Sequence, residues 1–156
     1  MSTLTHIIVK AEDELWAMPS VYAYSTHYVD SLMHIPFTPK YPWGGMGLVD
    51  GQVHAVILLQ NYIRASPAES AVRAMPKQSW LILLEPVSWR VCMGVDRIVG
   101  YAEDLVVMHD ASKNMKAKYK SHWKGAPVWV LDVALLLKTY NLLDPGVVAD
   151  SVHGTK

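Results

Sequence analysis

Histidines are the side chains of this chain best suited to acid–base catalysis or metal binding. A zinc site built from local ligands needs close pairs such as H-x-x-x-H, H-x-H or H-E-x-x-H. None of these spacings occurs, and each histidine falls in a separate predicted element. The pattern therefore predicts hydrogen-bonded or surface histidines and neither a metal nor another cofactor. The seven are His6, His27, His34, His54, His109, His122 and His153.

Nucleophilic chemistry finds little support in the sequence. The single cysteine, Cys92, stands between Val91 and Met93 with no cation nearby to activate it, which predicts a packed thiol. No G-x-S-x-G elbow occurs, and "WGGMG" lacks the lysine and the helix of a phosphate-binding loop. His109 and Asp110 are adjacent, so on a strand they would point to opposite faces. The residues therefore show no recognisable catalytic motif, and an enzyme with an unrecognised histidine-built site stays a third hypothesis.

The run "KNMKAKYKSHWK", residues 113–124, combines five lysines with Tyr119 and Trp123. Such mixtures can bind single-stranded nucleic acid, which makes a small nucleic-acid-binding barrel the alternative function. Aromatic residues and lysines alternate, however, as on a strand with one dry and one wet face. Lysine on an exposed strand also prevents edge pairing. A solvated strand is the preferred interpretation, with no nucleic-acid partner.

Composition places the chain among globular proteins. Hydrophobic residues make up 51% and charged residues 18%, and Lys+Arg and Asp+Glu both number 14. The balanced charge gives no field that would attract nucleic acid or an anionic membrane. No apolar stretch approaches the roughly 20 residues of a membrane helix, and residues 1–16 lack a signal-peptide pattern. These features predict a cytoplasmic protein without membrane insertion.

The stretch "GLVDGQVHAVILL" indicates how the chain is built. Asp50-Gly51 favours a type I′ turn, because both central residues of that turn need positive φ. Residues 53–59 are too short for a typical helix and rich in β-branched types, so they predict a strand buried on most of its surface. His54 would point outward or cap a barrel end.

The remaining segments predict short strands separated by turns. Residues 60–77 favour a short helical connection, and "DVALLLKTYNLL" a closing helix over 132–142, with Asp132 as N-cap and Asp144-Pro145 as its stop. About nine or ten strands with these two helices predict an all-β fold. The strands are expected within 6–18, 20–29, 79–103, 104–110 and 118–133, the last pair joined by a Lys124-Gly125 turn.

Three ordered segments resemble the CheW-like family of chemotaxis coupling proteins. They are "HIPFTPKYPWGGMGLVDGQVHAVILL", "WRVCMGVDRIVGYAEDLVV" and "KYKSHWKGAPVWVLDVALLL". The resemblance implies two five-stranded, SH3-like β-barrel subdomains over residues 4–142, with halves meeting near 78 and a polar tail at 143–156. It also implies a non-enzymatic adaptor of a chemotaxis or type IV pilus system. Its partners would be the regulatory domain of a CheA-like histidine kinase and the cytoplasmic tip of a chemoreceptor.

The resemblance also identifies candidate partner-binding residues. The family arginine before the turn glycine falls on Asp50, which inverts its charge, while the turn glycine is kept as Gly51. The family valine and glutamate of an earlier strand fall on Ala23 and Ser25, and Val53 opens the strand after the turn. The strand pattern and the turn glycine of the family are thus retained, while the residues at the polar contact positions differ. This combination favours a divergent accessory adaptor.

Overall fold

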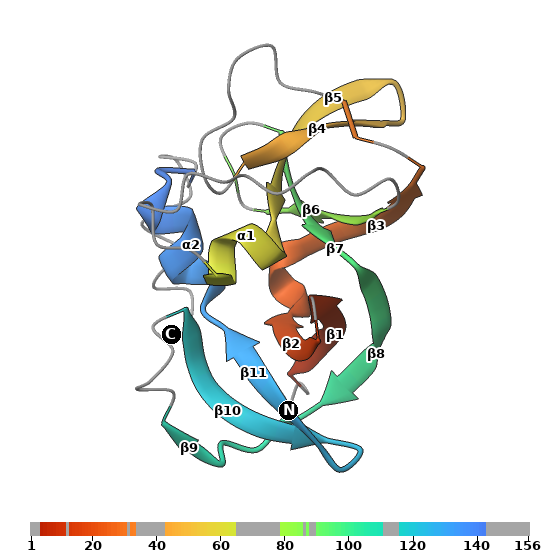
Figure 1. Ribbon diagram of the computed structural model, residues 1–156. Coiled ribbons are helices and arrows are strands. Elements are labelled where there is room, and N and C mark those ends of the chain that lie inside the picture. Colours follow the sequence, from red (N-terminus) through yellow and green to blue (C-terminus); the bar gives the residue numbers. More distant parts are fainter. Residues whose placement is uncertain are drawn as a thin grey trace.

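The computed structural model describes residues 4–11, 13–30, 32–33, 43–64, 79–85, 87, 90–110 and 116–142. Strands dominate this part of the chain, as the sequence predicts, and the elements follow one another as shown in Figure 1. The strands are β1 (Thr5–Ala11), β2 (Glu14–Pro19), β3 (Ala23–Val29), β4 (Trp43–Val49), β5 (Gln52–Leu58), β6 (Ser79–Leu84), β7 (Val91–Val95), β8 (Arg97–Glu103), β9 (His109–Asp110), β10 (Ala117–Trp123) and β11 (Ala126–Leu131). The helices are η1 (Ser20–Tyr22), α1 (Leu59–Arg64) and α2 (Val133–Thr139).

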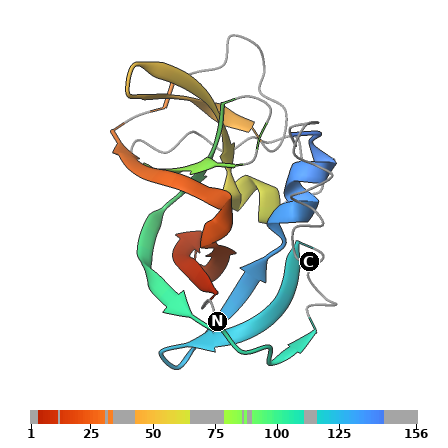
Figure 2. The same cartoon turned by 180° about the vertical axis from the view of Figure 1, so that it is seen from behind.

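The strands form two sheets, which confirms the all-β, two-subdomain prediction. One sheet has the order β8-β1-β2-β11-β10-β9 and the other the order β3-β6-β7-β5-β4 (Figures 1 and 2). The first sheet has six strands where five were expected, because the two-residue β9 pairs with β10. The strand expected over 104–110 is correspondingly short, since residues 105–108 are not in a strand.

Strand pairing crosses the expected midpoint of the chain. β6 and β7 lie after residue 78 but pair with β3 and β5, whereas β11 pairs in parallel with β2. The boundary expected near residue 78 therefore does not separate the two sheets. Each sheet takes strands from both halves of the sequence, which ties the halves together.

Two tight turns follow the local sequence closely. Asp50 and Gly51 have φ of 50° and 79°, and Lys124 and Gly125 have 50° and 80°. In both hairpins the flanking residues are direct partners across the strands, so each loop has two residues. Both central residues of each turn have positive φ, which agrees with the type I′ turn predicted at Asp50-Gly51 and gives Lys124-Gly125 the same signature. β5 ends at Leu58, one residue earlier than expected, because Leu59 opens α1.

One hydrophobic core joins the two sheets. Apolar residues of β1, β2, β5, β6, β7, α1 and α2 form a single buried cluster, which includes Trp16 and Tyr62. In β1 the alternation of side chains sends Ile7 and Val9 to this core and Ile8 to a second cluster within the six-stranded sheet. Both faces of β1 are thus buried at its centre, which explains the three consecutive apolar residues Ile7, Ile8 and Val9. We call the first cluster the shared core.

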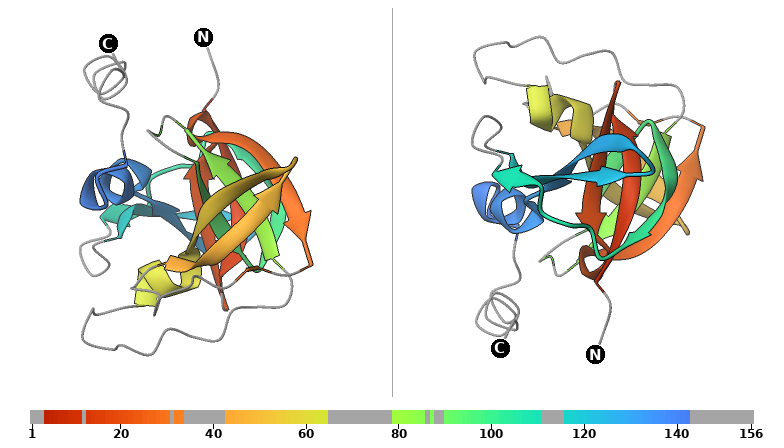
Figure 3. Two further views of the ribbon diagram at one scale, coloured as in Figure 1. Left: turned by 90° about the horizontal axis from the view of Figure 1, so that it is seen from above. Right: turned by 90° about the horizontal axis from the view of Figure 1, so that it is seen from below.

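The closing helix α2 packs against the shared core. Helices α1 and α2 lie on the same side of the sheets (Figure 3). The N-cap of α2 is Asp132 as predicted, because the Leu135 N–H donates to Asp132 Oδ1 at 3.0 Å. The helix ends at Thr139, before the expected residue 142. Asn141 has φ of 57°, and this left-handed residue turns the chain so that the Leu142 N–H donates to the Leu137 carbonyl.

Several expectations lie outside the described residues. These are the later part of the connecting helix at 65–77, the Asp144-Pro145 stop and the tail at 143–156. Among the described residues, no helix combines the length and the apolar character needed to cross a membrane.

The lysine run is only partly solvated. Lys116 is half-buried, its Nζ donates to the Tyr62 carbonyl at 3.1 Å, and it lies 3.9 Å from the centroid of the Tyr62 ring. Lys120 lies over Trp129, whereas Lys118 is exposed. The interpretation of this run as a uniformly solvated strand is therefore wrong at Lys116. That side chain connects the turn before β10 to α1.

Replacing Lys116 by methionine is expected to lower the free energy of unfolding by about 1 kcal/mol, since the variant keeps the apolar stem but loses the hydrogen bond from Lys116 Nζ to the Tyr62 carbonyl. Lys118→Met, two residues later on β10, is the matched control, and we expect a change within about 0.5 kcal/mol. Urea unfolding measures both. Equal stability of the two variants would show that the contact to α1 contributes nothing.

Candidate partner-binding surface

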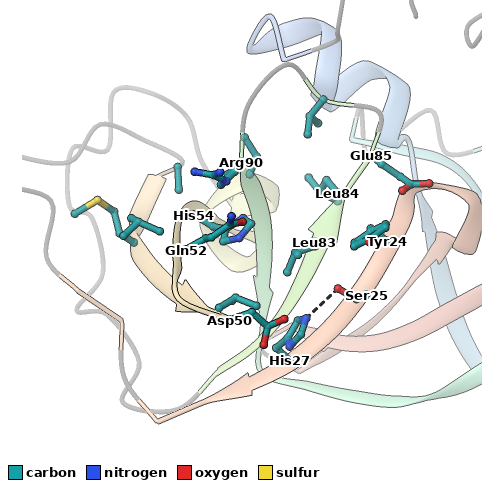
Figure 4. A pocket seen from close by; sticks show the side chains of 16 residues that line it. Tyr24, Ser25, His27, Asp50, Gln52, His54, Leu83, Leu84, Glu85 and Arg90 are labelled. Atoms are coloured by element: carbon teal, nitrogen blue, oxygen red, sulfur yellow. Dashed lines mark hydrogen bonds between the residues drawn. The ribbon is translucent and has the colours of Figure 1, made fainter.

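An open hollow on the five-stranded sheet brings together residues that are distant in sequence. Its volume is about 1220 Å³, and its lining comes from β3, the β4–β5 hairpin, the end of β6 and the start of β7 (Figure 4). Leu83 and Leu84 lie between the polar side chains of β3 and those of the hairpin (Figure 4). We call it the sheet hollow, and it is lined by Tyr24, Ser25, His27, Met46, Val49, Asp50, Gln52, Val53, His54, Ala55, Leu83, Leu84, Glu85, Val87, Arg90 and Val91.

Three of the five candidate partner-binding residues line the sheet hollow. They are Ser25, Asp50 and Val53, and Gly51 completes the turn that carries Asp50. Val53 is 48% exposed, so an apolar side chain is available beside the carboxylate. Ala23 does not line the hollow, because it pairs with Leu84 and packs against the shared core.

The sheet hollow contains a group of imidazole and guanidinium side chains. His54 is only 6% exposed, and its Nδ1 has no hydrogen-bond partner among the described residues. Burial lowers the pKa of His54, the electrostatic interactions with Arg90 and His27 lower it further, and Asp50 opposes the shift. His54 is therefore uncharged at neutral pH. The expectation that it points outward is wrong, because the side chain is buried in the wall of the hollow.

Ser25 and His27 form a hydroxyl–imidazole pair, with 2.9 Å between Ser25 Oγ and His27 Nε2. Catalysis of the serine-hydrolase kind needs a third group that orients the imidazole through its other nitrogen. None of the described residues makes that hydrogen bond. The pair is better explained as a polar wall of the hollow than as a nucleophile and its base.

The sequence did not single out His27, Gln52, His54 or Arg90 as members of one site. Ser25 and His27 are two residues apart on a strand, so they share a face, and this was the one local signal available. Arg90 reaches the hollow because β7 pairs in parallel with β5, with Ala55 opposite Val91. A parallel pairing between strands so far apart leaves no local sequence signal.

Acid is expected to destabilise the fold through two buried histidines. His6 is 1% exposed and burial lowers its pKa, as it does for His54. In the unfolded chain these imidazoles take up protons below about pH 6.5, whereas in the folded protein they stay uncharged to lower pH. The free energy of unfolding therefore falls as the pH is lowered. In urea titrations at pH 7.5 and 5.5, His54→Gln should lose less stability on acidification than the parent. The exposed His122 is the control, and equal pH dependence of His54→Gln and His122→Gln would contradict the assignment.

Neither metal ligands nor a reactive thiol was found in the described residues. No group of three or more His, Cys, Asp or Glu side chains there could hold a metal ion. Cys92 is fully buried, and burial raises its pKa to about 12, which confirms the predicted packed thiol. The sheet hollow is lined by both polar and apolar side chains.

The described residues form a two-subdomain β fold that is also found in a known scaffolding protein. A solved structure with this fold is the scaffolding protein TtCheW from Thermoanaerobacter tengcongensis, with a TM-score of 0.66 and 14% sequence identity. The similarity covers 88% of this chain and 89% of that one. No protein-family profile and no curated protein sequence matches the chain. At this identity the comparison establishes the fold, in agreement with the resemblance of the three sequence segments.

Proposed function

We propose that the protein is a non-enzymatic adaptor of a bacterial chemosensory system. In this role it couples the regulatory domain of a CheA-like histidine kinase to a chemoreceptor tip or a related partner in the cytoplasm. The observation that carries the proposal is the structural similarity to a scaffolding protein over nearly the whole of both chains. The ordered sequence motifs support it independently.

The sheet hollow is the proposed contact surface. It combines exposed apolar side chains, Tyr24 at 72% and Val53 at 48%, with charged groups on its rim. Protein interfaces favour such mixtures, with aromatic and arginine side chains enriched. Asp50, where the resembled family has arginine, implies a partner surface that is neutral or basic at that point, because like charges facing each other cost several kcal/mol.

The alternative, nucleic-acid binding through residues 113–124, receives less support. Tyr119 and Trp123 pack against the inner cluster of the six-stranded sheet, and Lys124 lies over the Trp123 ring at 4.8 Å. Single-stranded nucleic acid needs open aromatic faces on which bases can stack. These two rings are engaged within the protein.

Direct binding to purified partners tests the proposal. The protein should bind the regulatory domain of its own organism's CheA-like kinase, or a receptor-tip fragment, in a titration by calorimetry. Single-stranded DNA at moderate salt serves as the comparison ligand and should bind weakly or not at all. The adaptor function would be contradicted if neither protein ligand bound at concentrations of roughly 100 micromolar, about the dissociation constant of a weak signalling complex.

A further inference from the structure

Strand β8 is a free edge of the six-stranded sheet. Among the described strands it pairs with β1 alone, and it lies on the periphery of the molecule (Figures 1 and 2). The Asp104 N–H donates to the Leu4 carbonyl at 2.9 Å. Because hydrogen bonding alternates along an antiparallel pair, the backbone groups of Tyr101 and Glu103 point away from β1. The open edge can therefore accept another strand.

The sequence of β8 is complementary to itself. Read as Arg-Ile-Val-Gly-Tyr-Ala-Glu, it carries a cation at one end and a carboxylate at the other. In an antiparallel pair of two such strands centred on Gly100, Arg97 faces Glu103 of the second copy and Val99 faces Tyr101. Each of these contacts occurs twice, since the arrangement has two-fold symmetry.

The side chains that would meet are exposed and available. Val99 is 37% and Tyr101 is 61% exposed. Arg97 and Glu103 are exposed as well, and neither side chain has a hydrogen bond or ion pair within the described part of the chain. Pairing about Gly100 would thus give both charges a partner and cover two apolar side chains.

We propose that two copies of this chain associate through their β8 strands, antiparallel and centred on Gly100. This association is separate from the proposed adaptor function, because β8 belongs to the other sheet from the sheet hollow. Lone edge strands are usually protected by charges and bulges, and β8 has both, since its register with β1 skips Val99. Here the charges admit one register: a shift by two residues would place Arg97 opposite Tyr101 and leave Glu103 unpaired.

The strand length limits the affinity. Asp104, with φ of 52°, turns the chain away after Glu103, so only seven residues of each copy can pair. The surface area buried between two seven-residue strands is small compared with the roughly 1,600 Å² of a standard interface. We therefore expect a dimer that dissociates on dilution, with a dissociation constant of about ten micromolar or above.

Charge exchange tests the proposal by sedimentation velocity over a concentration series up to several hundred micromolar. The parent should form a concentration-dependent dimer. Arg97→Glu and Glu103→Arg each place like charges opposite each other twice, so each should weaken the dimer about tenfold. The double variant Arg97→Glu with Glu103→Arg restores opposite pairs and should recover parent affinity. Thermal unfolding of the four proteins at low concentration controls for folding.

The double variant separates this register from other modes of association. Recovery in the double variant after loss in both single variants supports antiparallel pairing centred on Gly100. A chain that stays monomeric at several hundred micromolar overturns the proposal. So does a dimer that the single reversals leave unchanged, or one that the double variant fails to restore.

Discussion

Replacing Trp16 by alanine is expected to lower the free energy of unfolding by about 3–5 kcal/mol, the range for removing a large aromatic side chain from a core. Trp16 is 1% exposed and belongs to the shared core that joins the two sheets. Its ring packs against Trp129, with 6.3 Å between the centroids. The cavity would open between the subdomains, so both sheets should unfold together. Urea unfolding followed by circular dichroism measures the loss.

Trp16→Phe is the matched variant. The indole N–H has no hydrogen-bond partner among the described residues, so phenylalanine loses volume without breaking a polar contact. We expect a cost of about 1–2 kcal/mol, clearly below that of alanine. A loss under about 1 kcal/mol for Trp16→Ala would mean that the subdomains do not share a core at this point.

The second large effect is expected at Asp50, on the rim of the sheet hollow. Asp50→Lys should weaken binding to the kinase or receptor partner at least tenfold, since it reverses a charge opposite a neutral or basic partner site. Asp50→Asn should weaken it less, because it removes the charge without reversing it. Both variants should fold normally. Asparagine tolerates positive φ, and lysine already occupies the same position of a type I′ turn at Lys124.

The second hairpin provides the control for this experiment. Lys124→Asn alters an exposed charge in a turn of the same type, on the sheet that does not carry the hollow. It should leave partner affinity unchanged. The interface assignment of Asp50 is wrong if Asp50→Lys binds the partner as tightly as the parent at low salt, where charge effects are largest.

Local features of the fold could be predicted from sequence because their causes are local. Asp50-Gly51 and Lys124-Gly125 form two-residue turns, as the need for positive φ requires. Asp132 caps the closing helix through a hydrogen bond to a residue three positions later. The buried strand after Gly51 follows from its short run of β-branched residues.

The features that depend on long-range pairing could not be predicted. Nothing near β5 or β2 in sequence indicates that they pair in parallel with β7 and β11. Those pairings bring Arg90 to the hollow beside His54 and mix the two halves of the chain in both sheets. Lys116 contacts Tyr62 across 54 residues of sequence, which is why a lysine in a charged run could not be identified as half-buried.

Site-specific photo-crosslinking from the sheet hollow tests the central claim most directly. A photoreactive residue would replace Val53, which is exposed in the hollow, and in a second protein Leu135, which is exposed on α2 outside it. Both would be expressed in the native cell, and the crosslinked products identified by mass spectrometry. The account predicts a CheA-like kinase or a chemoreceptor joined at position 53 and absent at position 135. The account would be contradicted if neither a CheA-like kinase nor a chemoreceptor were crosslinked at position 53. Equal crosslinking at positions 53 and 135 would contradict it as well.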